Sequence, residues 1–365
     1  MAVDRAEYAA WLRLLEAPGL GRAGVRRLLA AFGSAPAVLD ASAAALRGVV
    51  GAAGAAALAQ APLDFETRQA TALAWLDGGA RRSILTLGDP GYPPLLLQTS
   101  DPPLLLYLDG DAALLTAPSI AIVGSRNPSA QGADNARAFA AALSRADLLV
   151  VSGLAQGIDA AAHEGALAAG APTLAVVGSG PDIVYPRQHR GLSGRIAGHG
   201  LLVSEYAPGT PPLPLNFPQR NRIIAGLTRG TLVVEAALRS GSLITARLAS
   251  EAGREVFAIP GSIHLPQARG CHALIRQGAK LVESSNDILE ELGAPRQVAS
   301  TVVAEPGANA DPLLDALGQD PTTLDALAAR TGWSAAALNA RLLELELDGK
   351  VGRLPGGLFQ RRGNG

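Results

Sequence analysis

The chain has 365 residues, of which 48% are hydrophobic and 17% are charged, and its formal net charge is −1. This length accommodates two or three domains, and the near-neutral charge excludes a protein that coats nucleic acid by bulk positive charge. The single cysteine, Cys271, excludes an internal disulfide and fits a reducing compartment.

Targeting and membrane segments are not expected in this sequence. Asp4, Arg5 and Glu7 prevent the N-terminus from forming an apolar stretch long enough for a signal peptide. No run approaches the ~20 apolar residues that span a bilayer. We therefore expect a soluble, cytoplasmic protein with no membrane partner.

Residues 4–60 have the apolar spacing of helices. A Pro-Gly-Leu-Gly turn at 18–21 separates one periodic stretch from a second, 23–32. The arrangement resembles a helix-hairpin-helix, whose turn amides hold a phosphate, and a second copy starts near Val49-Val50-Gly51. A small helical interaction domain without a ligand is the open alternative. The clustered cations of this region are Arg22, Arg26 and Arg27.

Alternating segments after residue 80 predict a parallel sheet with helices on both faces. Short apolar runs alternate with alanine-rich helical stretches, and continuous apolar runs are typical of strands buried on both sides. We therefore predict an α/β fold, with a doubly wound and mostly parallel Rossmann-like sheet. The predicted strands are 119–123, 148–151, 173–177, 201–204, 231–235, 256–259 and 280–283.

The sequence after the sheet has the composition of a linker and then of a small module. Three helical segments and a hairpin-like stretch at 351–360 favour a winged helix. Its third helix carries Glu344, Glu346 and Asp348, which repel phosphate, so we interpret this module as ancillary or as a protein-interaction element. The predicted domains are 1–78 (helix-hairpin-helix or SAM-like), 79–293 (Rossmann-like), 294–310 (linker) and 311–365 (winged helix).

Small and polar residues follow several of the predicted strands. In a doubly wound sheet the ligand lies beyond the carboxyl ends of the strands. Glycine and hydroxyl residues at helix N-termini there expose amides that favour anions, and Arg126 adds a guanidinium group suited to phosphate. We therefore predict a phosphate or sugar-phosphate ligand. The loops concerned are Gly124-Ser125-Arg126, the loop that begins at Gly153, Gly178-Ser179-Gly180, and Ser240-Gly241-Ser242 with Thr245.

The run Phe217-Pro218-Gln219-Arg220-Asn221-Arg222 is the most distinctive in the chain. Pro218 can start a helix, which places the two arginines near its first turn. Cations there oppose the helix dipole, and a bound anion would offset that cost. An internal ion pair between Arg222 and Glu235 is the structural alternative. Phe217 either stacks on a base, which is worth ~1–3 kcal/mol, or belongs to the core.

The sheet region resembles the DNA-processing protein A family, also called DprA or Smf, over roughly residues 90–283. The segments that carry this resemblance keep the order and the spacing of the family, which is far more specific than a single glycine motif. They are 121–126, 152–159 with Ala162-His163, 178–180 with Tyr185-Pro186, 217–226, 234–236, 240–246 and 278–279.

The resemblance implies a homodimer that binds single-stranded DNA during natural transformation and helps to load the RecA recombinase against bound single-strand-binding protein. Gln156 and Gln219 stand where many relatives have basic residues, and His189 and His272 stand where asparagine is usual. The first two lower the positive charge of the predicted groove. The predicted DNA-binding residues are Gly124, Ser125, Arg126, Gly153, Gly178, Ser179, Gly180, Phe217, Arg220, Asn221, Arg222, Ser240, Gly241, Ser242 and Thr245.

A catalytic role is not expected. The sequence has neither a P-loop nor a G-x-S-x-G nucleophile elbow, and its histidines lack zinc-site spacing, so we predict no cofactor and no metal. We interpret Asp159 as a helix N-cap and His163 as a packed side chain. The alternative function is that of a nucleotide phosphoribohydrolase resembling the lysine-decarboxylase-like proteins, whose Pro-Gly-Gly-x-Gly-Thr-x-x-Glu run is missing here.

Overall fold

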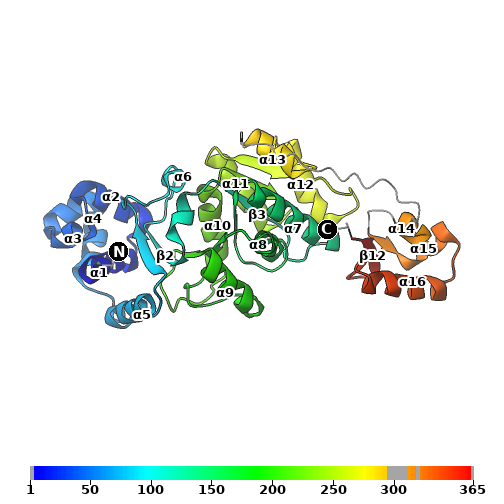
Figure 1. Ribbon diagram of the computed structural model, residues 1–365. Coiled ribbons are helices and arrows are strands. Elements are labelled where there is room, and N and C mark those ends of the chain that lie inside the picture. Colours follow the sequence, from blue (N-terminus) through cyan, green and yellow to red (C-terminus); the bar gives the residue numbers. More distant parts are fainter. Residues whose placement is uncertain (1–3, 294–310, 318–320, 363–365) are drawn as a thin grey trace.

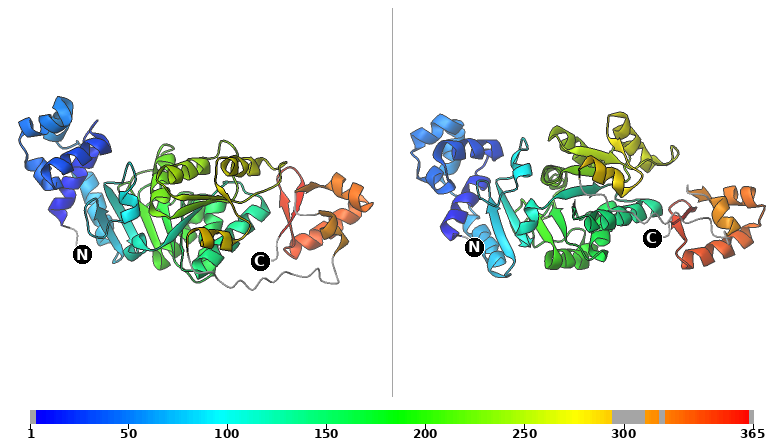
Figure 2. Two further views of the ribbon diagram at one scale, coloured as in Figure 1. Left: turned by 90° about the horizontal axis from the view of Figure 1, so that it is seen from above. Right: turned by 45° about the horizontal axis from the view of Figure 1, so that its top comes forward.

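The computed structural model describes residues 4–293, 311–317 and 321–362. A helical N-terminal part and a small C-terminal part lie at opposite ends of a central sheet (Figures 1 and 2). The predicted fold class, a mostly parallel Rossmann-like sheet between a helical region and a winged helix, is confirmed. The predicted linker, 294–310, lies outside the described residues, and the predicted domain bounds remain predictions.

The N-terminal part consists of two helix–turn–helix units, α1 with α2 and the two halves of α4, and two further helices, α3 and α5. Gly19 and Gly21 form the first turn with φ values of +75° and +61°, which side-chain-bearing residues rarely adopt. Gly51, with φ +75°, divides α4 at the second turn. The Tyr8 hydroxyl lies 3.0 Å from that of Tyr107, so these helices share a buried core with the sheet. The helices are α1 (Arg5–Glu16), α2 (Gly21–Phe32), α3 (Ala35–Asp40), α4 (Ala43–Ala59) and α5 (Phe65–Asp77).

The central sheet has nine strands within the described residues, in the order β1-β2-β6-β5-β4-β3-β7-β8-β9. β3 to β9 are parallel, whereas β2 pairs antiparallel with both β1 and β6. The sequence did not predict β1 or β2. The strands are β1 (Arg82–Thr86), β2 (Leu105–Gly110), β3 (Ser119–Val123), β4 (Leu149–Ser152), β5 (Thr173–Val177), β6 (Leu201–Ser204), β7 (Gly230–Val233), β8 (Glu255–Ala258) and β9 (Lys280–Leu281).

Helices cover both faces of this sheet, as the continuous apolar strands require (Figure 1). Alternate residues of each strand enter separate cores: Ile120 and Ile122 face one set of helices, and Ala121 and Val123 face the other. One face carries α7 (Ala130–Arg145), α8 (Ile158–Ala168), α9 (Arg190–His199) and α13 (Ser285–Glu291). The opposite face carries α6 (Pro94–Leu97), α10 (Asn216–Leu227), α11 (Gly241–Glu251) and α12 (Arg269–Arg276).

The C-terminal part is a winged helix. Leu338, Leu342 and Leu345 of α16 form its core, and the acidic side chains that alternate with them are exposed. Its elements are α14 (Pro312–Leu317), β10 (Thr322–Thr323), α15 (Leu324–Thr331), α16 (Ala335–Leu347), β11 (Val351–Leu354) and β12 (Leu358–Arg361). Across all the described ranges, no helix has the length and apolarity to cross a bilayer.

Candidate functional site

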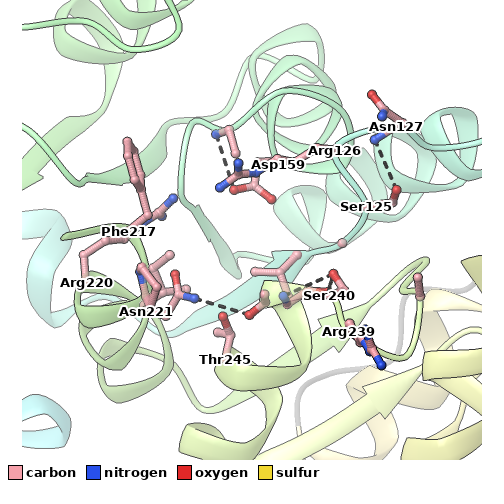
Figure 3. Close-up of a pocket in the computed structure, with 18 of the residues that line it drawn as sticks. Ser125, Arg126, Asn127, Asp159, Phe217, Arg220, Asn221, Arg239, Ser240 and Thr245 are labelled. Atoms are coloured by element: carbon pink, nitrogen blue, oxygen red, sulfur yellow. Dashed lines mark hydrogen bonds between the residues drawn. The ribbon is translucent and has the colours of Figure 1, made fainter. Parts of the chain in front are cut away.

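A cleft of about 790 Å³ opens at the carboxyl ends of the central strands. The chain leaves β3 toward β4 over one face of the sheet and returns to β7 over the other face, so the strand order reverses beside β3. Loops diverge at such a reversal and leave a crevice in which doubly wound proteins bind ligands. One wall carries Ser125, Arg126 and Asp159, and the opposite wall carries Asn221, Ser240 and Thr245 (Figure 3).

The loop after β3 presents an unpaired cation. A side chain at Gly124 would place its Cβ 2.7 Å from Ile158 and 2.9 Å from the Glu235 carbonyl oxygen, so only glycine fits this approach of loop to helix. The Ser125 hydroxyl accepts the Asn127 amide at 3.1 Å. Arg126 is exposed and makes no ion pair with any residue in the described ranges. Its guanidinium group is therefore available to an anion.

Arg126 lies beside an aromatic pair. Its guanidinium carbon is 5.9 Å from the centroid of the Phe217 ring, and that ring is 5.4 Å from the ring of Tyr185. A Cβ at Gly178 would come within 2.9 Å of Phe217, so this glycine makes room for the ring. Tyr185 is 49% exposed, and Phe217 is half-buried in the cleft wall. The rings are tilted by 44° to each other, so each offers its own face for stacking beside the guanidinium group.

The opposite wall is the start of α11. The Ser240 hydroxyl caps this helix by accepting the Ser242 amide at 3.3 Å, and the Asn221 side-chain amide donates to the Gly241 carbonyl at 3.4 Å. Gly241 has open space where a Cβ would lie. Arg239 is exposed before the cap and has no ion-pair partner among the residues described. A cation without an ion-pair partner in the described structure therefore lies beside a helix N-terminus, where the dipole also favours negative charge.

Arg220 supports the floor of the cleft. It is 4% exposed and donates to the Val176 carbonyl at 3.0 Å and to the Gly153 carbonyl at 2.8 Å. Asp159 accepts the amides of Gly153 and Ala155, and burial raises the pKa of its carboxyl group while Arg220 opposes that rise. Both terminal nitrogens of Arg220 thus donate inside the protein, while its buried Nε has no hydrogen-bond partner among the described residues.

Arg222 does not line the cleft, and its predicted place there needs correction. It lies on the side of α10 that faces the N-terminal helices, where it pairs with Glu205 at 2.5 Å and with Asp101 at 3.1 Å. The alternative pair with Glu235 is also wrong, because Glu235 accepts the amide and the hydroxyl of Ser129. Arg222 belongs to an interdomain arginine cluster, which consists of Arg22, Arg26, Arg222, Asp101 and Glu205.

The cleft brings together ten of the residues predicted from sequence and excludes five. Gly153, Gly178, Ser179 and Gly180 shape the loops beneath it; the buried Ser179 hydroxyl donates to the Ile183 carbonyl. The predicted residues that line it are Gly124, Ser125, Arg126, Phe217, Arg220, Asn221, Ser240, Gly241, Ser242 and Thr245. Lining residues that were not among the predicted DNA-binding residues include Asn127, Tyr185, Arg239 and Gln267. Position after a predicted strand was the available signal for Asn127 and Arg239.

Asp159 and His163, the acid–base candidates named from sequence, are committed to internal contacts. Gly157, not Asp159, is the N-cap of α8, which corrects the predicted cap. His163 is fully buried, its Nδ1 lies 2.8 Å from the Thr173 hydroxyl oxygen, and burial lowers its pKa to about 3. Within the described ranges, no three His, Cys, Asp or Glu side chains are placed to hold a metal ion.

Comparison with known proteins identifies close relatives of the chain. The sequence model described as DNA recombination-mediator protein A matches residues 83–293, and that of the DprA winged helix domain matches residues 297–357. Protein Smf of Escherichia coli is 41% identical over 302 residues, which is 80% of each chain. The DNA processing protein DprA of Streptococcus pneumoniae is 51% identical over 203 residues, covering 56% of this chain and 72% of the relative.

Solved structures agree with the sequence comparison. The X-ray structure of DNA processing protein A from Streptococcus pneumoniae has a TM-score of 0.69 and 37% identity, and the match covers 81% of this chain and 100% of that one. A structure of the Helicobacter pylori protein, described by its single-stranded DNA binding mode, has a TM-score of 0.52 and 30% identity, with coverages of 57% and 95%.

Proposed function

This chain belongs to the DNA recombination-mediator protein A (DprA/Smf) family, and from that premise we propose that its cleft binds single-stranded DNA. The observation that carries the proposal is the exposed Arg126 guanidinium group, which lies over the Phe217 ring without a carboxylate partner in the described part of the chain. A cation beside a stacking surface matches the two components of a nucleotide, its phosphate and its base.

The charge balance of the cleft supports a polyanionic ligand. Arg126 and Arg239 are exposed on opposite walls. Asp159 is the one acidic residue among those that line the cleft in the described structure, and it is 7% exposed with its carboxylate turned to backbone amides. Because the free cations face solvent while the carboxylate does not, phosphate groups are attracted into the cleft.

Preference for single strands follows from the aromatic pair. A base can stack on Phe217 or Tyr185 only if it leaves its own stack and turns one face to the ring. A single strand does this at little cost, whereas a duplex must first unpair and unstack at a cost of a few kcal/mol. We therefore expect the protein to discriminate against duplex DNA.

Fluorescence anisotropy with labelled oligothymidine tests this proposal. Phe217→Ala should weaken binding about 5- to 150-fold, which corresponds to the ~1–3 kcal/mol of one stacked base. Arg126→Ala and Arg239→Ala should each lower the slope of log K against log salt by about 0.7. Arg145→Ala is the control and should bind normally, because Arg145 is exposed at the far end of α7 and its side chain has no partner among the described residues. Equal affinity for duplex and single-stranded DNA would overturn the proposal.

We further propose that the cleft binds without catalysis. A phosphoribohydrolase needs a carboxylate free to act on the ribose, but Asp159 and Glu235 are both held by internal donors. Incubation of the pure protein with nucleoside monophosphates should release no free base. Steady release would favour the enzyme instead.

The roles of partners are proposed from family membership alone. We propose that the protein acts in the cytoplasm as a homodimer and loads RecA onto single-stranded DNA held by single-strand-binding protein. Sedimentation equilibrium should then give twice the chain mass of 37.1 kDa. The protein should stimulate strand exchange by RecA when single-strand-binding protein is present. If strand exchange is not stimulated, the loading role is wrong, but DNA binding in the cleft is not affected by that result.

A further inference from the structure

A group of free arginines continues from the edge of the cleft onto α9. Between residues 183 and 204 the chain carries Arg187, Arg190 and Arg195 and no acidic residue. All three arginines are exposed, and none of their guanidinium groups has a hydrogen-bond or ion-pair partner in the part of the chain that the structure describes. Three unpaired guanidinium groups so close in sequence repel one another, which favours a role in binding negative charge.

Neighbouring acidic residues do not neutralise these arginines. Asp182, on the preceding loop, accepts the Gly209 amide with both carboxylate oxygens. Glu164, on the adjacent helix α8, pairs with Arg137. The local potential over α9 is therefore positive, although the whole chain is close to neutral.

The exposed face of α9 forms a narrow strip between two of the arginines. At 100° per residue, Arg190 and Arg195 lie about 140° apart on the helix, and Gly191, Gly194 and Gly198 fall between them. An added Cβ at any of these glycines would meet nothing within 4 Å, so no neighbouring element packs on the strip. A phosphodiester backbone can thus approach the helix closely while the arginines reach it from either side.

This strip begins at the cleft. Tyr185, which lines the cleft and contacts Phe217, is followed by Pro186, the short helix η2 (Arg187–His189) and α9. α9 then runs over the outer face of the sheet, beside α8, toward the start of β6 (Figure 1). The eight residue-to-residue steps from Arg187 to Arg195 extend roughly 12 Å at the rise of an α-helix, which adds room for phosphates beyond those in the cleft.

We propose that single-stranded DNA leaving the cleft past Tyr185 continues along α9, where Arg187, Arg190 and Arg195 bind its phosphates. This α9 track rests on the proposed function of the cleft and extends it to longer DNA. Contacts to phosphate carry no base information, so the track increases affinity without adding sequence preference.

The test compares two charge-matched triple variants. The track variant is Arg187→Gln, Arg190→Gln and Arg195→Gln. The control variant is Arg145→Gln, Arg229→Gln and Arg276→Gln, which removes the same charge at exposed arginines whose guanidinium groups have no hydrogen-bond or ion-pair partner among the described residues and which lie near the amino ends of the strands, away from the cleft and α9. Binding is measured by anisotropy with oligothymidines of about 6 and about 20 nucleotides, since sites on single strands cover about 4–16 nucleotides.

The track variant should bind the short oligonucleotide as the wild type does, because that length fills the cleft alone. Its affinity for the long one should fall on the order of 10- to 50-fold at 0.15 M salt, with a salt slope smaller by about 2, as for three phosphate contacts. The control variant should bind both lengths normally.

Two results would overturn the track. One is wild-type affinity and salt slope of the track variant for the long oligonucleotide; the other is an equal loss in the control variant, which would indicate bulk charge. If wild-type protein binds neither length, the cleft proposal fails and the track fails with it. If wild-type protein binds the short oligonucleotide, the cleft proposal holds, and the affinity of the track variant for the long oligonucleotide then tests the track alone.

Discussion

Replacing Arg222 with alanine separates the structural arginines of α10 from those available to DNA. The Arg222 side chain is 12% exposed and that of Glu205 is 10% exposed, so their ion pair at 2.5 Å is nearly buried. Arg222→Ala leaves the Glu205 carboxylate with Arg22 as its remaining cation, at 3.9 Å. The substitution also removes one of the three arginines that bind Asp101.

The expected loss of stability is large. Removal of one partner from a buried ion pair costs about 3–5 kcal/mol, because the other charge stays buried without compensation. A domain of 150–250 residues loses about 2–4 °C in Tm per kcal/mol, so a loss of about 4 kcal/mol corresponds to a Tm lower by about 8–16 °C. The exposed pair of Arg5 and Asp77, with side chains 68% and 66% exposed, provides the contrast, since Arg5→Ala should cost about 0–1 kcal/mol.

Circular dichroism melts and oligothymidine binding, measured on the same preparations, decide the question. Arg222→Ala should melt early and, below its Tm, bind DNA with nearly wild-type affinity. Arg126→Ala should do the reverse, because Arg126 has no ion pair within the described ranges and exposed residues of that kind contribute within about 0.5 kcal/mol. If Arg222→Ala melts like the wild type yet loses DNA binding, the structural assignment of this arginine is refuted.

Two further predictions concern buried groups. Burial lowers the pKa of His163 from 6.5 to about 3, so the unfolded state binds the proton first as the pH falls. The free energy of unfolding should therefore decrease by about 1.4 kcal/mol per pH unit between pH 6.5 and pH 3. His163→Asn keeps a donor for Thr173 and should make the free energy of unfolding in urea depend less on pH over that range; an unchanged pH dependence would contradict the assignment. At Gly153 an added Cβ would lie 1.6 Å from the Arg220 guanidinium group, so Gly153→Ala should lower the Tm by several degrees. Gly191 on α9 has open space around it, so Gly191→Ala should raise the free energy of unfolding by up to about 1 kcal/mol. Equal Tm values for the two variants would refute this prediction.

The sequence predicted the parallel part of the sheet because those strands are buried on both faces. Runs 119–123, 173–177 and 201–204 coincide with β3, β5 and β6, since each is continuously apolar and ends at glycine or a polar residue. β1 and β2 were missed. β1 is only partly buried along its whole length, and the Pro/Gly-rich segment between the two strands indicated a loop. Pairing at an antiparallel edge depends on partners that local periodicity does not reveal.

The sequence predicted those site residues whose place depends on following a strand. It did not predict those whose place depends on a partner far away in the sequence. Arg126 follows β3 directly, so the switch-point rule was sufficient to find it. Arg222 stands two residues after Arg220 in the same run, yet its partner Asp101 lies 121 residues away in sequence. No local pattern distinguishes a cation with such a partner from a free one. The aromatic contact between Tyr185 and Phe217 depends in the same way on two loops meeting.

The near-neutral composition is compatible with DNA binding because salt limits how far each charge acts. At physiological ionic strength the Debye length is about 8 Å, so acidic residues beyond that distance hardly affect a phosphate in the cleft. In the described structure Asp101 and Glu205 pair with arginines at the interdomain cluster, whereas Arg126 and Arg239 face the cleft unpaired. What controls affinity is therefore which guanidinium groups lack a nearby carboxylate. Asn127→Asp would place a carboxylate beside Arg126 and should weaken the binding of single-stranded DNA. Gln60→Glu adds the same charge on the N-terminal helices, far from the cleft, and should weaken binding less.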